Sequence, residues 1–185
     1  RARAIGAVNT VTVRADGTLH GSNSDAFGFI ANLKAEAPDW HPAAGPAVVL
    51  GAGGAARAVL SALLDEGVPA IRLVNRHRER ADMLAKAFAA KIDVRPWEQR
   101  MSLLEGANLL VNATSLGMVG APPLDLALDA LPADAVVNDI VYTPLETPLL
   151  AAARRRGNRA VDGLGMLMHQ GRPGFAAWFG VEPDV

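Results

Sequence analysis

A glycine-rich segment has the spacing to bind phosphate groups. In the pattern G-x-G-x-x-A, the first glycine permits a tight turn and the second lets the backbone approach a pyrophosphate. The final alanine allows the next helix to pack closely on the preceding strand, and the free N–H groups at the start of that helix attract phosphates. The pattern predicts a dinucleotide site, with a turn used only for packing as the alternative. The segment reads Gly51-Ala52-Gly53-Gly54-Ala55-Ala56.

Basic residues follow the next expected strand, 71–74. The residues at the end of this strand distinguish a site for NAD from a site for NADP. A site for NAD usually places Asp or Glu about 20 residues after the glycine turn, to bind the ribose 2′-hydroxyl. This chain has no carboxylate at the end of that strand, and arginines follow it. Arg76 and Arg80 can form charge-assisted hydrogen bonds with a 2′-phosphate, which predicts NADP. The alternative is a solvated helix face whose arginines pair with Glu79 and Asp82.

Alternating strand and helix patterns must position these groups. Apolar runs bounded by turn residues are typical of strands buried on both faces. The alternation predicts an α/β fold with a doubly wound parallel, Rossmann-like sheet, whose carboxyl strand ends bind the ligand. Helices are expected from the glycine turn to residue 67, over 78–90, shortly before 104 and over 147–156. The expected strands are 47–50, 71–74, 92–95, 109–112, 135–140 and 159–161.

The first 45 residues follow a different pattern. Two β-favourable runs flank the turn Ala15-Asp16-Gly17-Thr18, which predicts a hairpin. Asp25 then stands where a helix N-cap belongs, ahead of apolar residues at helical spacing. Pro38 to Pro42 is expected to end that helix and form a linker.

Composition excludes several classes of function. The 185 residues include no cysteine, which excludes disulfides and thiolate chemistry, and the four histidines lack metal-ligand spacing. The net charge is −1, and the one basic run, Arg154-Arg155-Arg156, lies at a helix C-terminus, where the dipole favours cations. No apolar run approaches the ~18 residues needed to span a bilayer. We therefore expect no metal, nucleic-acid or membrane partner and a cytoplasmic location.

Seven short segments, spread in order along the whole chain, match the motifs of one protein family. Together they resemble the shikimate dehydrogenase family. The resemblance implies an NADPH-dependent, reversible reduction of 3-dehydroshikimate to shikimate in aromatic amino-acid (chorismate) biosynthesis. The segments are Ile5-Gly6-Ala7-Val8-Asn9-Thr10, Gly21-Ser22-Asn23-Ser24-Asp25, Gly51-Ala52-Gly53-Gly54-Ala55, Asn75-Arg76, Asn112-Ala113-Thr114-Ser115, Asp139-Ile140-Val141-Tyr142-Thr143-Pro144 and Asp162-Gly163-Leu164-Gly165-Met166-Leu167.

The resemblance also implies roles at the substrate. Asp25 would be the carboxylate of a catalytic Lys–Asp pair, and Asn9, Tyr142 and Gln170 would bind the substrate with it. A carboxylate alone is a poor proton donor at neutral pH, so Asp25 would support a neighbouring lysine. Without the resemblance, these residues read as a helix cap, a hairpin amide, ordinary packing and an exposed helical amide. His169 is assigned to the surface or the core.

At the cofactor, the resemblance implies contacts from five places in the chain. The glycine turn, Asn75, Arg76 and Arg80 would bind the phosphates and the adenosine. Thr114 would lie near the nicotinamide, and Ile140 and Gly163 would contact its end of the cofactor. The alternative for Thr114 is a loop hydroxyl that caps the next turn.

The family's proteins are longer than this chain, and the resemblance implies four parts here. Residues 1–24 would be the last hairpin of an N-terminal substrate domain, 25–45 a connecting helix and linker, 46–162 the NADP-binding domain, and 163–185 a helix packing back towards the substrate domain. The absent part would carry a Ser-x-Ser pair and the catalytic lysine. None of Lys34, Lys86 and Lys91 lies in a matching motif.

We therefore expect these 185 residues alone to bind NADP and to show little or no turnover. Ser24 stands where the family usually has Thr, which keeps the hydroxyl and loses a methyl contact. Two rival interpretations stay open: a quinate/shikimate dehydrogenase that uses NAD, and a non-catalytic NADP-binding module. Either a monomer or a homodimer is expected.

Overall fold

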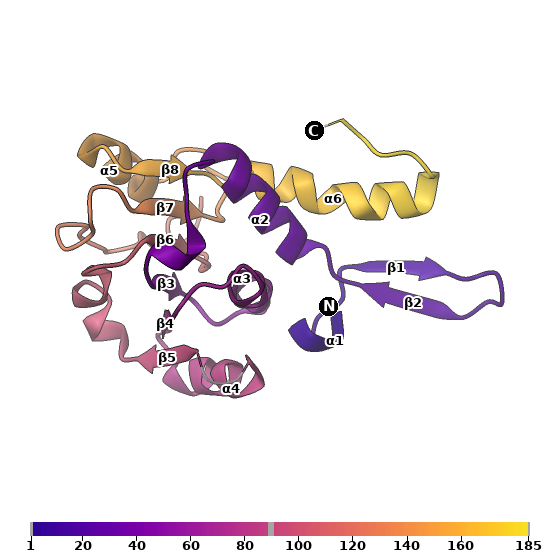
Figure 1. Cartoon of the computed structure of the whole chain (residues 1–185), viewed down its shortest axis with the longest axis horizontal. Helices are drawn as coiled ribbons and strands as arrows, with labels where there is room; N and C mark the ends of the chain where they lie inside the picture. The colour runs from indigo at the N-terminus through magenta and orange to yellow at the C-terminus, as the bar shows by residue number, and fades with distance from the viewer. Residues whose placement is uncertain (1, 89–90, 185) are drawn as a thin grey trace.

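Six parallel strands form the central sheet of the computed structural model, which describes residues 2–88 and 91–184 (Figure 1). Their order across the sheet is β5-β4-β3-β6-β7-β8, so the chain starts in the middle and winds outward in both directions. This is the predicted doubly wound topology, with the change of direction between β3 and β6. The strands are β3 (Ala47–Leu50), β4 (Ile71–Val74), β5 (Ile92–Arg95), β6 (Leu109–Asn112), β7 (Val136–Asp139) and β8 (Arg159–Val161).

Apolar side chains cover both faces of the sheet. In β3, Ala47 and Val49 belong to one core, while Val48 and Leu50 belong to the other, because successive side chains point to opposite faces. The first core is covered by α2 (Asp25–Glu36), α3 (Gly54–Asp65) and α4 (Arg78–Phe88). The second is covered by α5 (Pro148–Arg156), the 3₁₀ helix Ser102–Leu104 and the chain around Leu128 and Leu131.

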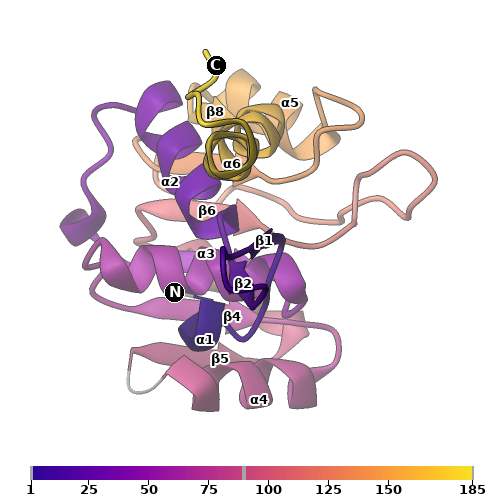
Figure 2. The same ribbon diagram turned by 90° about the vertical axis from the view of Figure 1, so that its right-hand side faces the viewer.

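A two-stranded hairpin projects from this body, as predicted. β1 (Thr10–Val13) pairs antiparallel with β2 (Leu19–Ser22), and Gly17 in the turn has φ +81°. The last helix, α6 (Leu164–Phe179), lies against α2 and extends alongside the hairpin (Figures 1 and 2). The indole N–H of Trp178 donates to the carbonyl of Val11 at 3.1 Å, which ties the end of α6 to β1.

Some expectations about element ends were wrong. Ser24, not Asp25, is the N-cap of α2, because the side chain of Asn23 accepts the N–H of Asp25 and draws that residue into the first turn. A short helix, α1 (Ala2–Ile5), precedes the hairpin where no helix was expected. The strand expected over 135–140 is shorter, and the expected end of the helix over 78–90 falls partly on residues 89 and 90, outside the described residues.

The helix predicted over 147–156 and its end at Gly157 are confirmed, although the helix begins one residue later, at Pro148. Thr147 is the N-cap of α5, with its hydroxyl accepting the N–H of Leu150, and Gly157 ends that helix with φ +86°. In the basic run of α5, Arg154 pairs with Glu146, and Arg156 donates to the carbonyl of Leu131.

Over residues 2–88 and 91–184, the structure has no helix that is both long and apolar enough to cross a bilayer, and no group of three side chains suited to hold a metal ion.

Candidate active site

The glycine turn connects β3 to α3 and brings the loop after β6 close to it. Gly51 has φ +106°, and a Cβ there would lie 2.6 Å from the carbonyl oxygen of Ala113, so only glycine fits. Gly53 is the N-cap of α3, and a Cβ there would meet no atom within 4 Å, so its backbone faces open space. Ala56 is fully buried, which allows α3 to pack on the sheet. These are the conformations that a phosphate-binding turn requires.

A cavity of about 350 Å³ lies over this turn, at the carboxyl ends of the parallel strands. Three loops line it: the glycine turn, the loop after β6 and the loop after β7. Thr114, Ile140 and Tyr142 lie in its wall. The family resemblance assigns Thr114 and Ile140 to the nicotinamide end of a cofactor and Tyr142 to the substrate. Gly163 approaches Ile140 so closely that a Cβ would lie 2.2 Å from the Ile140 carbonyl oxygen.

The arginines after β4 are exposed at the same edge of the sheet. Within the described part of the chain, neither Arg76 nor Arg80 has an ion pair, whereas Arg78 pairs with Asp82 at 3.5 Å. The amide of Asn75 donates to the carbonyl of His77 at 2.8 Å and closes the turn that presents these arginines. Of the ion pairs that the alternative of a solvated helix face would involve, the described residues show only that of Arg78 with Asp82.

A polar cluster forms where the hairpin, α2 and α6 meet. The amide nitrogen of Asn9 donates to Asp25 Oδ1 at 2.8 Å, to Ser24 Oγ at 3.0 Å and to Gln170 Oε1 at 3.2 Å. Asn23 Nδ2 donates to the other oxygen of Asp25 at 3.3 Å. The structure thus brings together three of the four predicted substrate-binding residues, from segments up to 161 positions apart.

Close helix packing makes this cluster possible. A Cβ at Gly28 of α2 would lie 2.6 Å from the Cβ of Gln170, so α6 can approach only because residue 28 is glycine. One turn after Gly28 in α2, the buried side-chain amide of Asn32 donates to the carbonyl of Asp162 at 2.7 Å, just before α6 begins. These contacts place Gln170 beside the first turn of α2, which carries Asp25.

A second cavity, of about 180 Å³, connects the cluster with the cofactor side. Asp25 and Gln170 line it together with Ile140, Tyr142 and Gly163. Ile140 and Tyr142 also line the larger cavity over the glycine turn. The two cavities therefore share one wall, at which a cofactor ring and a small substrate would meet.

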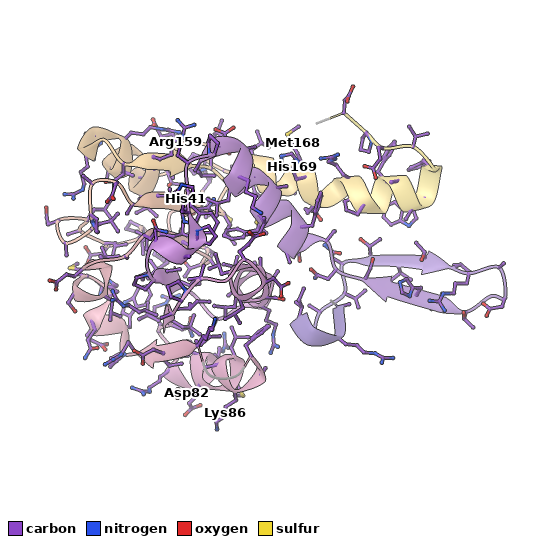
Figure 3. The ribbon with its side chains drawn as sticks, viewed as in Figure 1. His41, Asp82, Lys86, Arg159, Met168 and His169 are labelled. Atoms are coloured by element: carbon purple, nitrogen blue, oxygen red, sulfur yellow. The ribbon has the colours of Figure 1, made fainter. Side chains whose placement is uncertain are left out.

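The lysines of the described residues lie away from Asp25. Lys34, near the end of α2, pairs with Glu66 at 2.8 Å. Lys86 projects from α4, away from α6 (Figure 3). Lys91 is exposed and precedes β5. No proton-donating ammonium group from residues 2–88 and 91–184 therefore accompanies Asp25.

His169 is half-buried on α6, and its Nδ1 is buried without a hydrogen-bond partner.

One feature of the site was not predicted from the sequence: a buried polar pair at the ends of β6 and β7. Asn112 and Asp139 are both fully buried, and the Asn112 amide donates to Asp139 Oδ1 at 2.9 Å. Burial raises the pKa of Asp139 above its ordinary value, while hydrogen bonds from Thr147, Val141 and Asn112 partly offset the shift. A polar residue ending each of two apolar strands was the available signal.

The doubly wound parallel sheet and the glycine turn between β3 and α3 define a Rossmann-like dinucleotide-binding protein. The chain belongs to the shikimate dehydrogenase family. A family model described as shikimate / quinate 5-dehydrogenase matches residues 37–118. The shikimate dehydrogenase (NADP(+)) of Rhodospirillum rubrum is 61% identical over 189 residues, and that of Paramagnetospirillum magneticum is 61% identical over 184. Both alignments cover 100% of this chain and 67% of the relative, so the chain spans about two thirds of their length.

Solved structures agree with this assignment. Quinate dehydrogenase from Corynebacterium glutamicum in complex with NAD matches with a TM-score of 0.92 and 34% identity. Shikimate 5-dehydrogenase from Thermus thermophilus in complex with NADP(H) and shikimate matches with a TM-score of 0.83 and 41% identity. Each match covers 99% of this chain and 66% of the solved chain. The predicted fold and family are confirmed.

Proposed function

We propose that this chain is the NADP-binding part of an enzyme that reduces 3-dehydroshikimate reversibly to shikimate with NADPH. The observation that carries the proposal is the wall of Ile140 and Tyr142, which the cavity over the glycine turn shares with the cavity at Asp25. The family assignment and the NADP-linked relatives support the choice of cofactor and substrate.

The residues fit the proposed cofactor. Gly51, Ala52, Gly53, Gly54 and Ala55 would present backbone N–H groups to its pyrophosphate at the start of α3, where Gly53 leaves open space. Arg76 and Arg80 would bind the 2′-phosphate, since neither has an ion pair among the described residues, and Asn75 would hold their turn. Thr114, Ile140 and Gly163 would surround the nicotinamide.

The polar cluster would bind and orient the substrate. When bound, NADPH supplies a hydride. Asp25 would accept a hydrogen bond from the substrate hydroxyl and stabilise a neighbouring ammonium group, while Asn9 and Gln170 would bind further hydroxyls. Asn9 already donates to both Asp25 and Gln170, so these groups are held in one arrangement before substrate arrives. Tyr142 would close the site from the cofactor side.

The four-part division of the chain belongs to the same proposal. Residues 46–162 contain all six strands of the central sheet, while 1–24 contain the hairpin. Residues 25–45 contain α2 and the linker, and 163–185 contain α6, which returns to the hairpin through Trp178. We also propose that the protein is located in the cytoplasm, which is a source of NADP(H). Its proposed oligomeric state is a monomer or a homodimer.

A second candidate is a quinate dehydrogenase that uses NAD. It is supported by the high structural similarity to the Corynebacterium glutamicum enzyme with NAD. The exposed arginines after β4 favour NADP instead, because a site for NAD gains nothing from two guanidinium groups at the ribose.

A binding and turnover experiment tests the proposal. The 185-residue chain would be titrated calorimetrically with NADP⁺ and with NAD⁺, and assayed for oxidation of NADPH by 3-dehydroshikimate. The same assays would use this chain fused to the part of the Rhodospirillum rubrum relative that it does not cover. We expect both proteins to bind NADP⁺ more tightly than NAD⁺ and only the fusion to turn over. Absence of NADP⁺ binding, or a fusion active with quinate and NAD⁺ alone, would contradict the proposal.

A further inference from the structure

We propose that Asp139 is a positioning residue that holds the two loops of the nicotinamide end in their binding arrangement. The inference rests on the proposed function, because it assigns a nicotinamide to the cavity over the glycine turn. It is carried by the hydrogen bonds that converge on the Asp139 carboxylate, which does not itself line the cavity.

The carboxylate joins three separate pieces of chain. Asp139 Oδ1 accepts from Asn112 Nδ2 at 2.9 Å and from the N–H of Val141 at 3.1 Å. Asp139 Oδ2 accepts from the hydroxyl of Thr147 at 2.7 Å. The end of β6, the chain just after β7 and the start of α5 are thereby held on one side chain.

Asn112 extends this arrangement to the loop after β6. Its Oδ1 accepts from the N–H of Thr114 at 3.1 Å and from the Thr114 hydroxyl at 2.7 Å, while its Nδ2 also donates to the carbonyl of Leu116. Thr114 lines the cavity over the glycine turn. Asp139 orients the Asn112 amide, and the amide orients the cavity-lining threonine.

Val141 extends the arrangement to the loop after β7. Its N–H bond to Asp139 fixes the backbone between Ile140 and Tyr142, the two residues that line both cavities. A second link joins the loops directly, because the N–H of Val119 donates to the carbonyl of Thr143 at 2.9 Å. Movement of either loop would therefore disturb the shared wall.

The charge of Asp139 is compensated by donors alone. Within residues 2–88 and 91–184 it has no cationic partner, and it is fully buried. Asn112 Nδ2 and the Val141 N–H can only donate, and the Thr147 hydroxyl accepts from Leu150 and so directs its hydrogen to Asp139. This pattern matches an ionised carboxylate, and a buried unpaired charge is costly to keep. Its three bonds all secure cavity-lining loops or the helix beside them.

The test compares two ligands that differ at the nicotinamide end. NADPH would contact both loops, whereas adenosine 2′,5′-bisphosphate carries only the end that the glycine turn and Arg76 would bind. Asp139→Asn is the main variant. Thr147→Val removes only the bond to Oδ2, and Thr147→Ser keeps the hydroxyl as the matched control. Binding would be measured by calorimetry, and NADPH emission would report the surroundings of its ring.

We expect Asp139→Asn to raise the Kd for NADPH about tenfold and the Kd for the bisphosphate less than about twofold, since bonds to charged groups are strong. Thr147→Val should show a smaller loss with the same selectivity, and Thr147→Ser should bind like the unaltered chain. NADPH emission should rise on binding less in Asp139→Asn than in the unaltered chain.

Three results would overturn the inference: unchanged binding in a folded Asp139→Asn variant, equal losses for both ligands, or equal Kd values for the two ligands in the unaltered chain. If Asp139→Asn does not fold, the selectivity of Thr147→Val decides. An unaltered chain that binds neither ligand would instead refute the proposed function, which keeps the two failures distinguishable.

Discussion

The sheet region and the hairpin region of this molecule are built in opposite ways. In the sheet region, the central strands are buried on both faces, and every residue of β3, β6 and β7 is buried. In the hairpin region, Val13 and Leu19 are more than 70% exposed, and Phe179 at the end of α6 is 66% exposed. The sheet region therefore has its own core on each face, whereas the hairpin depends on its backbone pairing and on α6.

The largest effect is expected at Gly51, in the sheet region. Gly51→Ala would place a Cβ 2.6 Å from the Ala113 carbonyl at φ +106°, so we expect the free energy of unfolding to fall by about 3 kcal/mol. Gly53→Ala is the matched control, because its Cβ meets nothing, and it should cost under about 1 kcal/mol. Denaturant titration measures the free energy of unfolding of both variants. Equal losses would show that the close approach of Gly51 to Ala113 is not what requires glycine in this turn.

The next effect concerns the cofactor rather than stability. Arg76→Asp should weaken NADP⁺ binding about 30-fold and NAD⁺ binding less than about threefold, because only NADP⁺ carries the 2′-phosphate. Arg78→Asp alters an exposed arginine at the same helix start that already pairs with Asp82, so it should affect NADP⁺ far less. Calorimetry with both dinucleotides measures the difference. Equal losses for the two cofactors would remove Arg76 from the phosphate site.

A pH effect should distinguish the buried carboxylate from the exposed ones. The pKa of Asp139 is raised by burial above the 3.8 of an exposed aspartate, so the folded chain keeps this proton to higher pH than the unfolded chain does. The contribution to stability is therefore fully present below pH 3.8 and is lost as the pH rises through the folded pKa. The stability of the unaltered chain relative to Asp139→Asn should fall over that interval, as measured by denaturant titration at several pH values. If this stability difference rose with pH instead, the pKa of Asp139 would be lower in the folded chain than in the unfolded chain, contrary to the prediction.

The smallest effect on global stability is expected in the hairpin region. Trp178→Phe removes the indole bond to the Val11 carbonyl and should lower the free energy of unfolding by about 1 kcal/mol or less. Amide exchange in β1 and β2 should accelerate while exchange in β3 and β6 stays the same, because the two regions open separately. Equal acceleration in both regions would show that they unfold as one unit.

Local sequence patterns were enough to predict most of the elements. The six strands of the sheet, the hairpin turn at Gly17 and the end of α5 at Gly157 all lie where apolar runs and glycines indicated. The N-cap of α2 was misplaced by one residue, because the Asn23 side chain competes for the N–H of Asp25. Such competition between neighbouring polar side chains is decided by geometry that composition does not specify.

The parallel sheet, the glycine turn after β3 and the basic residues beyond β4 can be read from the amino-acid sequence alone, because hydrophobic periodicity and turn chemistry depend on near neighbours. The polar side chains that meet one another are fixed by the packing of the folded chain. Asn9 reaches Gln170 because Gly28 lets two helices approach, and Asn112 reaches Asp139 because two strands are adjacent in the sheet. Contacts of this kind depend on how distant segments pack, and no local pattern encodes that arrangement.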